Sequence, residues 1–240
     1  MPPKSIPRGL EHAAAFRRRL LAWFRRRGRD LPWRRTRDPY RVLVSEVMLQ
    51  QTPVSRVEAY YPAFLARFPD LAALAASPAS AVREAWDGLG YYRRATNLHR
   101  LARDVVSGHG GRMPSDVTTL RRLPGVGRYT AGAVASFAFE RVEPCVDTNV
   151  GRVIRRVFHP RLAGRPGADR RVWATAAALL PRDGKRAWLF NQAVMELGAM
   201  VCRARAPRCG ECPVNRECRT GRSQGKTGNR EQGTGNRERR

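Results

Sequence analysis

Apolar residues recur at intervals of three and four along most of this chain, and polar residues fill the positions between them. Such spacing places the apolar side chains on one face of a helix. Pro and Gly separate successive segments, and no segment alternates strictly between apolar and polar as a half-buried strand would. The pattern therefore predicts an all-α protein, with helices at Leu10–Arg27, Pro39–Gln51, Ser55–Phe68, Pro78–Asp87, Arg93–Ser107, Arg128–Phe139, Thr148–Phe158, Ala168–Leu180 and Lys185–Val201.

The final residues of the chain lack this periodicity. Residues 219–240 are polar and rich in Gly, and the pentapeptide TGNRE occurs twice, at 227–231 and 234–238. A segment with so few apolar residues cannot form a core. We expect a disordered basic tail over 219–240.

The charge of the chain narrows the kind of partner. The 240 residues include 46 Lys and Arg against 20 Asp and Glu, which gives a net charge of +26. The tail accounts for only +5 of this, because it has seven basic and two acidic residues. Excess positive charge on a chain with enough apolar residues to fold is typical of nucleic-acid binding. With no run of eighteen or more apolar residues, we expect no membrane span and a cytoplasmic protein.

Four of the five cysteines lie close together near the C-terminus in the spacing C-x6-C-x2-C-x5-C: Cys202, Cys209, Cys212 and Cys218. Four thiolates on one short, turning segment can surround a single centre, and sulfur ligation of this kind indicates zinc or an iron–sulfur cluster. Zinc sites usually pair their cysteines at short spacings on both sides, so the longer gaps favour iron–sulfur and leave zinc as the alternative. Disulfides are disfavoured, because no signal peptide precedes the chain.

A second informative stretch is LPGVGRYTAG, residues 123–132. Leu-Pro ends one short helix, and Gly125 and Gly127 are expected to take positive φ in a tight turn. A helix restarts at Arg128, with free N–H groups pointing out of the turn. Such a terminus attracts phosphate without reading sequence, although an ordinary loop between two helices would have the same residues.

Together these motifs resemble a known family. LPGVGRYTAG followed by VDTNV at 146–150 is similar to the helix-hairpin-helix, Gly/Pro-rich loop and aspartate of the base-excision DNA glycosylases, and the cysteine spacing resembles their iron–sulfur loop. Further stretches resemble the MutY-type adenine glycosylases within that superfamily: LPWR at 31–34, DPYRVLVSEVMLQQT at 38–52, GLGYYRRATNLH at 88–99 and FNQAVMELGAMVC at 190–202. The resemblance implies a two-lobed helix-hairpin-helix glycosylase fold with one 4Fe-4S cluster on the four cysteines.

Two carboxylates suit the chemistry of a glycosylase. The enzyme must protonate the departing base and stabilise the positive charge that develops on the sugar. Glu46 lies on an otherwise apolar helix, where a raised pKa would keep a proton available. Asp147 begins a helix whose free N–H groups favour the ionised carboxylate. The resemblance implies that Glu46 protonates adenine and handles the water, and that Asp147 stabilises the cation; a surface acid and a plain helix cap are the alternatives.

The resemblance also implies which residues contact the DNA. Gln50, Gln51 and Tyr91 are expected to fill the gap that the extruded nucleotide leaves. Asn149 and Tyr129 are expected to hold Asp147 and the flipped nucleotide in place. The hairpin supplies the remaining DNA contacts: Leu123, Gly125, Val126, Gly127 and Arg128.

A missing lysine constrains the mechanism. Endonuclease III-type enzymes attack the sugar with a lysine amine placed just after the G-V-G turn, and strand cleavage follows. This chain has Tyr129 there, and its three lysines are Lys4, Lys185 and Lys226. We therefore expect a monofunctional N-glycosylase, which removes a base without cutting the strand.

The identity of the base is less constrained. MutY-type enzymes continue past the iron–sulfur loop into a domain of roughly a hundred residues that reads 8-oxoguanine, whereas here twenty-two residues follow Cys218. We expect a short form that removes adenine opposite 8-oxoguanine or guanine. Tyr129 is also found in thymine/uracil mismatch glycosylases, so release of thymine or uracil opposite guanine is the alternative. A non-catalytic DNA-binding iron–sulfur protein and a redox sensor rank below both.

For the whole chain we expect two lobes. A six-helix module over residues 33–145 carries Glu46 and the hairpin, and a discontinuous lobe combines residues 1–32 with 146–218. The active cleft is expected between them. The expected partner is double-stranded DNA containing a mismatch, bound by a monomer at the nucleoid.

Overall fold

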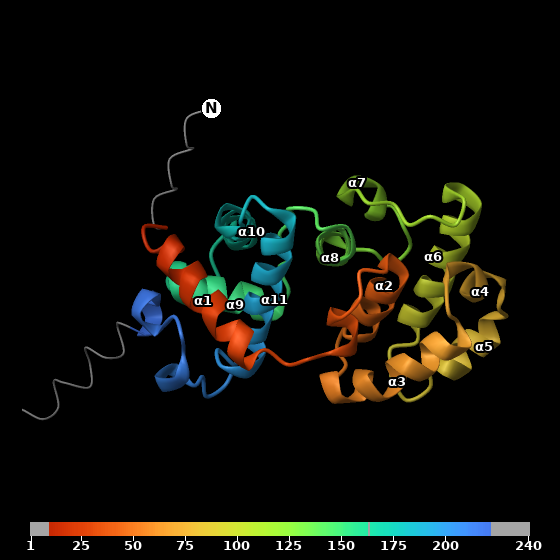
Figure 1. Ribbon diagram of the computed structural model, residues 1–240, viewed down its shortest axis with the longest axis horizontal. Coiled ribbons are helices and arrows are strands. Elements are labelled where there is room, and N and C mark those ends of the chain that lie inside the picture. Colours follow the sequence, from red (N-terminus) through yellow and green to blue (C-terminus); the bar gives the residue numbers. More distant parts are fainter. Residues whose placement is uncertain (1–9, 163, 222–240) are drawn as a thin grey trace, which may run out of the picture. The chain divides into compact units, whose positions relative to one another are not determined.

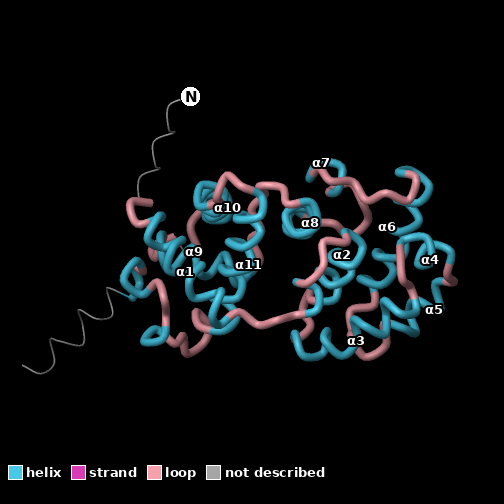
Figure 2. The backbone as a smooth tube through the Cα atoms, viewed as in Figure 1, coloured by secondary structure: helices cyan, strands magenta, loops and turns pink. Residues whose placement is uncertain are grey.

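The computed structural model describes residues 10–162 and 164–221, and within these residues the chain forms helices and loops without a strand (Figure 2). The expected all-α fold is confirmed. Both TGNRE repeats and the rest of the expected tail from residue 222 lie outside the described residues. The helices are α1 (Ala13–Arg27), η1 (Pro32–Arg34), α2 (Pro39–Met48), α3 (Val54–Arg67), α4 (Leu71–Ala76), α5 (Ala79–Ala85), α6 (Arg93–His109), α7 (Val117–Leu120), α8 (Arg128–Phe139), α9 (Thr148–Phe158), α10 (Ala168–Leu179), α11 (Gly184–Met200), η2 (Cys209–Glu211) and η3 (Asn215–Glu217) (Figure 1).

Aspartates begin five of these helices. Asp38, Asp70, Asp116, Asp147 and Asp183 each accept a hydrogen bond from a backbone N–H three residues later, at 2.7–2.9 Å, and start α2, α4, α7, α9 and α11 respectively. A side-chain acceptor at this position satisfies one of the N–H groups that the first turn of a helix leaves unpaired. The local sequence therefore specifies where these helices begin.

The chain divides into two compact units, each described by itself. The cysteine unit combines residues 1–28, 146–181 and 189–240, and the hairpin unit combines residues 29–145 and 182–188. In the cysteine unit, α1, α9 and α11 meet around Phe16, whose ring packs edge-on against Phe158 at 5.1 Å and Phe190 at 6.3 Å. This contact places α9, which starts at Asp147, against two helices from distant parts of the sequence.

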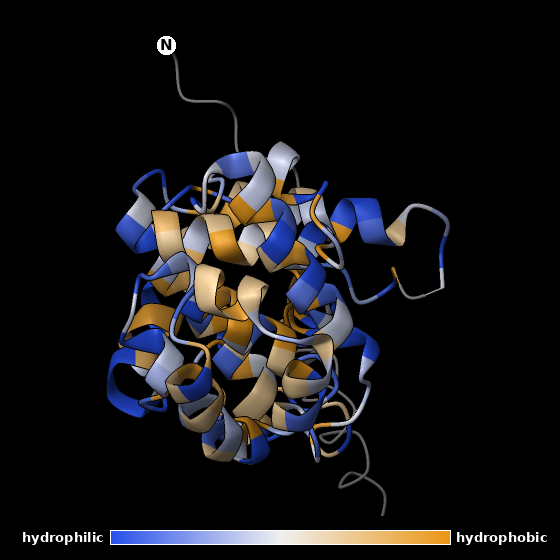
Figure 3. Cartoon of the chain, turned by 90° about the vertical axis from the view of Figure 1, so that its right-hand side faces the viewer, coloured by the Kyte–Doolittle hydropathy of each residue, from blue (hydrophilic) through white to orange (hydrophobic). Residues whose placement is uncertain are grey.

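The hairpin unit has an aromatic core of its own. Phe64 packs against Phe68 at 5.0 Å and against Trp86 at 5.7 Å, and all three side chains are buried. Figure 3 shows both hydrophobic and hydrophilic residues along individual helices, as expected for helices with one apolar face. α2 packs against α8 in this unit, and that contact positions the residues of the candidate site.

Candidate active site

Glu46 is a buried carboxyl group in the hairpin unit. Its side chain is 3% exposed on α2, and its Oε2 accepts a hydrogen bond of 2.7 Å from the hydroxyl of Tyr129. Tyr129 lies in the first turn of α8, so this bond joins α2 to the helix that follows the hairpin turn. The alternative of a surface acid at position 46 is wrong. A buried carboxyl group whose orientation is fixed by a hydrogen bond is the kind of group that can hold and transfer a proton.

Gln50, Gln51 and Tyr91 lie together at one surface of the same unit. They line a common cavity of about 430 Å³. Gln51 and Tyr91 have left-handed backbone conformations, with φ of 58° and 49°, and Tyr91 is 61% exposed. Non-glycine residues rarely adopt this conformation, and it often marks a functional position. Gln50 is tied back by a 3.4 Å hydrogen bond from its Nε2 to the hydroxyl of Thr130.

Arg94 fixes the two turns that carry these residues, and sequence reasoning missed it. Its Nη1 donates to the carbonyl oxygens of Val47 at 2.9 Å and Gln50 at 2.5 Å. Its Nη2 donates to those of Leu89 at 2.9 Å and Gly90 at 3.0 Å. One buried guanidinium therefore links the turn before Gln51 to the turn before Tyr91, because its planar fork presents several donors at once. No local sequence signal distinguishes Arg94 from its solvated neighbour Arg93.

The backbone of the hairpin turn has the expected positive φ at Gly125 but not at Gly127. Gly125 has φ of +75°, and a Cβ there would lie 2.8 Å from Cβ of Asn97. Gly127 has φ of −83° and ψ of 179°, so the expected positive φ is wrong at this position. Gly127 is instead the N-cap of α8, which has no side-chain cap, and a Cβ on it would meet no protein atom within 4 Å. The backbone donors of α8 therefore lie at an open surface.

Two further hairpin residues are anchors. Leu123 and Val126 are buried, and the backbone N–H of Val126 donates to the carbonyl of Leu123 at 3.1 Å to close the turn. Arg128 is exposed at the start of α8. The five predicted hairpin residues thus divide into buried anchors and exposed groups around one helix terminus.

Asp147 begins α9 in the cysteine unit and is half-buried. Its Oδ1 accepts from the backbone N–H of Val150 at 2.7 Å, and its Oδ2 accepts from Nδ2 of Asn149 at 2.9 Å. These donors and nearby Arg152 favour the carboxylate, but burial outweighs them and raises the pKa of Asp147. The N–H groups at the helix start favour the ionised form as expected, and the burial that outweighs them was not foreseen.

A chain of hydrogen bonds runs from Asp147 to Cys202, the first of the four clustered cysteines. Nη2 of Arg152 donates to Oδ1 of Asn149 at 2.7 Å and to the carbonyl of Gly198 at 2.8 Å. Nε of the same side chain donates to the carbonyl of Cys202 at 2.8 Å. A Cβ on Gly198 would lie 2.6 Å from Cβ of Asn149, so α11 passes very close to the start of α9. The sequence predicted Asn149 but gave no signal for Arg152.

The four predicted cysteines surround one cavity of about 200 Å³ and carry free thiols. Nη1 of Arg156 lies 3.5 Å from Sγ of Cys202, and the backbone N–H of Gly221 donates to Sγ of Cys218 at 3.4 Å. Burial raises the pKa of the Cys212 thiol to about 12, so metal binding there would release protons.

The arrangement suits a group larger than one ion. Among residues 10–162 and 164–221, no group of three or more His, Cys, Asp or Glu side chains is arranged to hold a metal ion. In a 4Fe-4S cluster each thiolate binds a different iron, which keeps the ligands farther apart than those of a single ion. Four thiols around a shared cavity, with hydrogen bonds to two of the sulfur atoms, fit that donor set.

No helix in the described part of the chain is both long and apolar enough to cross a membrane.

Comparison with known proteins gives the following matches. A family described as "HhH-GPD superfamily base excision DNA repair protein" matches residues 44–165. The adenine DNA glycosylase of Mycolicibacterium smegmatis is 50% identical over 201 residues, which cover 83% of this chain and 67% of that protein. The thymine-DNA glycosylase of Aeropyrum pernix is 40% identical over 207 residues, which cover 85% of this chain and 93% of that protein.

A solved structure shows the same fold. The structure of a thermostable thymine-DNA glycosylase superposes with a TM-score of 0.81 at 32% identity, and covers 88% of this chain and 97% of that one. The chain spans about two thirds or less of the length of the curated adenine glycosylases that it matches.

Proposed function

Since this chain belongs to the HhH-GPD superfamily of base excision DNA repair proteins, we propose that it is a DNA N-glycosylase that removes adenine from mismatched double-stranded DNA. The expected resemblance to MutY-type adenine glycosylases is confirmed by 50% identity over 83% of the chain. The expected helix-hairpin-helix glycosylase fold is confirmed by the superposition on a thymine-DNA glycosylase.

One observation carries the proposal: the buried Glu46 carboxyl group hydrogen-bonded to Tyr129. Breaking the bond between adenine and deoxyribose leaves its electron pair on the base, so a proton must reach the base as it departs. A buried carboxyl group that accepts a hydrogen bond from a hydroxyl can supply that proton. Glu46 is therefore assigned as the general acid.

The remaining steps need a second carboxylate and a water molecule. The sugar becomes positively charged as the bond breaks, and a carboxylate close to it stabilises that charge. Asp147, oriented by Val150 and Asn149, is assigned to this task. Water then adds to the sugar carbon and gives its proton to the Glu46 carboxylate, which restores the acid. The products are free adenine and an abasic site.

The strand remains uncut in this mechanism. Strand cleavage in lysine-dependent glycosylases begins with an amine on the sugar carbon, and the residue at that place in this chain is Tyr129. The tyrosine hydroxyl already donates to Glu46. Borohydride treatment should therefore trap little covalent enzyme–DNA adduct, whereas trapping comparable to that of a lysine-dependent enzyme would contradict the assignment.

We assign Cys202, Cys209, Cys212 and Cys218 as the ligands of one 4Fe-4S cluster. When bound, the cluster supplies four iron–thiolate bonds that tie the segment 202–218 into one shape. Cys202 lies at the end of α11, and its carbonyl accepts from Arg152, so the shape of this segment is linked to the start of α9. Four iron atoms and four sulfides per chain in purified protein would agree, whereas one zinc atom per chain would not.

Adenine is preferred over thymine on sequence identity, which is 50% to an adenine glycosylase and 40% to a thymine glycosylase. Removal of thymine or uracil opposite guanine is the second candidate. It is supported by 40% identity to the Aeropyrum pernix thymine-DNA glycosylase over 85% of this chain and by the superposition on a thymine-DNA glycosylase with a TM-score of 0.81. We propose guanine or 8-oxoguanine as the opposite base, and a monomer that works at the nucleoid.

A panel of four duplexes decides between these substrates. Purified protein is incubated with adenine opposite 8-oxoguanine, adenine opposite guanine, thymine opposite guanine and uracil opposite guanine, and alkali-labile sites are then counted. The proposal predicts breaks at adenine only. Breaks at thymine or uracil without breaks at adenine would establish the second candidate.

A further inference from the structure

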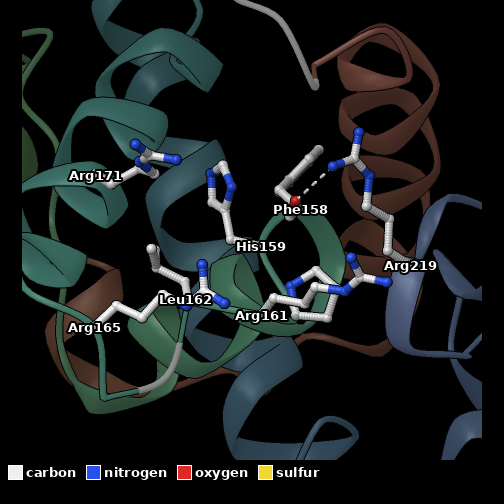
Figure 4. Close-up of a pocket in the computed structure, with 8 residues that line it drawn as sticks. Phe158, His159, Arg161, Leu162, Arg165, Arg171 and Arg219 are labelled. Carbon is white, nitrogen blue, oxygen red and sulfur yellow. Dashed lines mark hydrogen bonds between the residues drawn. The ribbon is translucent and has the colours of Figure 1, made fainter.

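A basic pocket of about 440 Å³ lies in the cysteine unit at the C-terminal end of α9 (Figure 4). Three segments form it: the end of α9 with the loop after it, the first turn of α10, and the residue after Cys218. Phe158 and Leu162 are buried beneath it and give it an apolar floor. The charged residues that line it are all basic: Arg161, Arg165, Arg171 and Arg219.

The lining of the pocket includes neither Asp nor Glu. Arg219 pairs with a carboxylate outside that lining, Glu11, at 3.6 Å. Arg161, Arg165 and Arg171 are exposed and form no ion pair among residues 10–162 and 164–221, whereas Arg67 elsewhere on the surface pairs with Glu84 at 2.8 Å. Like charges that converge without a partner repel one another, and an anion in the pocket would relieve that repulsion.

Two fixed side chains give the pocket its shape. Nη1 of Arg219 donates to the carbonyl of Phe158 at 3.0 Å, which ties the segment after Cys218 to the end of α9. Nε2 of His159 lies 2.8 Å from the hydroxyl of Thr175. Figure 4 shows His159 between Arg171 and Arg219. The pKa of His159 is lowered, first by burial and then by Arg171 and Arg219, as expected in a region of excess positive charge.

This pocket lies away from the proposed catalytic aspartate. Asp147 is the N-cap of α9, and Phe158 is the last residue of that helix. Eleven helical residues span about 16 Å. A ligand in the pocket therefore occupies a place separate from the nucleotide at Asp147.

We propose that the pocket at the end of α9 is a binding site for phosphate groups, separate from the catalytic site. Guanidinium forks match the oxygens of phosphate geometrically, and several forks around one concave site favour a ligand with more than one phosphate. A volume of about 440 Å³ suits a small polyphosphate or a short stretch of DNA backbone. The site does not depend on which base the enzyme removes.

The test compares two variants of the full-length protein that lose the same charge. The pocket variant is Arg161→Gln/Arg165→Gln/Arg171→Gln. The control variant, Arg100→Gln/Arg103→Gln/Arg112→Gln, changes three exposed arginines of the hairpin unit. Inorganic pyrophosphate is titrated into each by calorimetry. The proposal predicts that the pocket variant binds pyrophosphate about tenfold more weakly than wild type or not at all, while the control binds as wild type does.

A second arm identifies the source of the phosphate. Affinity is measured for a short duplex ending within about five nucleotides of the target base, and for a duplex twice as long. If DNA supplies the phosphates, the pocket variant loses affinity for the long duplex alone, and its salt dependence falls by about one for each lost contact. If free polyphosphate is the ligand, both duplexes bind unchanged while pyrophosphate binding is lost.

Three results would overturn the proposal: equal pyrophosphate and DNA binding by wild type and the pocket variant, equal losses in the control variant, or binding of polyglutamate with no binding of pyrophosphate. The rate of base release on the short duplex is measured alongside. It separates a failure of the phosphate-site proposal from a failure of the glycosylase assignment. The proposal predicts that this rate is unchanged in the pocket variant.

Discussion

The two carboxyl groups of the candidate site differ, residue by residue, in what surrounds them. Glu46 is buried and accepts a hydrogen bond from the hydroxyl of Tyr129. Asp147 accepts from a backbone N–H and from the amide of Asn149. Different surroundings of this kind can give two carboxyl groups different protonation behaviour, as the proposed acid and the proposed cation-stabilising carboxylate require.

Tyr129→Phe tests the role of the hydroxyl on Glu46. Losing one hydrogen bond to a catalytic acid should slow base release about tenfold under single-turnover conditions. Tyr61→Phe is the matched control, because the Tyr61 hydroxyl donates to the carbonyl of Arg41 at 3.1 Å in the core of the same unit. The control should change stability rather than rate, and an equal loss of rate in both variants would deny the hydroxyl a specific role.

Asn149→Ala tests how the charge on Asp147 is maintained. Burial already raises the pKa of Asp147, and the Asn149 amide opposes that effect. In the proposed mechanism the carboxylate is the active form, so the rate should fall as the pH drops through this pKa. Removing the amide raises the pKa further, so the fall should begin at a higher pH in the variant. A variant with lower rates at every pH but an unchanged midpoint of the pH–rate profile would contradict this.

Asp147 also shows which properties of a single residue can be predicted from the sequence. Its place at the start of a helix was predictable from VDTNV, and so was the N–H donor of Val150. Its burial depends on the fold around it, where α11 passes close to the start of α9: a Cβ on Gly198 would lie 2.6 Å from Cβ of Asn149. The sequence therefore predicted the N–H donors that favour the carboxylate but not the burial that raises its pKa.

The hairpin turn shows how elements present the backbone to a ligand. Gly125 is required by the protein, since it has a positive φ and lies close to Asn97. Gly127 has an ordinary extended conformation and open space around it. The protein itself does not require a glycine there, whereas a phosphate approaching the N–H groups of α8 would.

The variants Gly125→Ala and Gly127→Ala should therefore fail differently. The first should lower the free energy of unfolding by about 1–3 kcal/mol, because alanine is strained at positive φ and collides with Asn97. The second should leave the unfolding midpoint nearly unchanged and weaken binding to undamaged duplex DNA. Wild-type DNA affinity in Gly127→Ala would remove the hairpin from the DNA-binding surface.

Arg94→Lys tests the link between the two turns that carry Gln51 and Tyr91. Lysine retains the charge but not the fork, so several buried hydrogen bonds are lost. Stability should fall by about 2–3 kcal/mol, measured by denaturant unfolding, with a weaker DNA affinity at temperatures where the variant is folded. Arg100→Lys, on the exposed face of the same helix, is the control. Equal stability in the two variants would contradict the account.

Helices were the most predictable elements, because apolar spacing and aspartate caps are local. The helix α4 was missed, since LAALAA is a short, almost uniformly apolar run without clear periodicity. Its signal was Asp70, which accepts from the N–H of Ala73. The Arg94 and Arg152 networks were beyond prediction, because their acceptors are carbonyl oxygens of distant segments.

For the whole molecule, the excess of positive charge has more than one use. The sequence supported only a general preference for nucleic acid from a net charge of +26. In the structure, Arg94 and Arg152 donate hydrogen bonds to backbone carbonyls, each within its own unit. Arg67 belongs to an ion pair. Three of the arginines that line the pocket at the end of α9, Arg161, Arg165 and Arg171, form no ion pair among residues 10–162 and 164–221 and so contribute to the field that a polyanion meets.

The substrate is the property of the whole molecule that rests most on comparison. Adenine and thymine glycosylases both match this chain over more than four fifths of its length. Glu46, bonded to Tyr129, is the feature that links the structure to protonation of a departing base. The central claim is therefore that this chain releases adenine by means of Glu46.

Free adenine released from a duplex with adenine opposite guanine, measured in a single turnover for wild type and for Glu46→Gln, tests that claim most directly. The account predicts that wild type releases adenine and leaves the strand intact until alkali is added, and that Glu46→Gln is at least about a hundredfold slower while its unfolding midpoint stays close to that of wild type. Release of adenine by Glu46→Gln at a rate within about twofold of wild type, or no release by either protein, would contradict it.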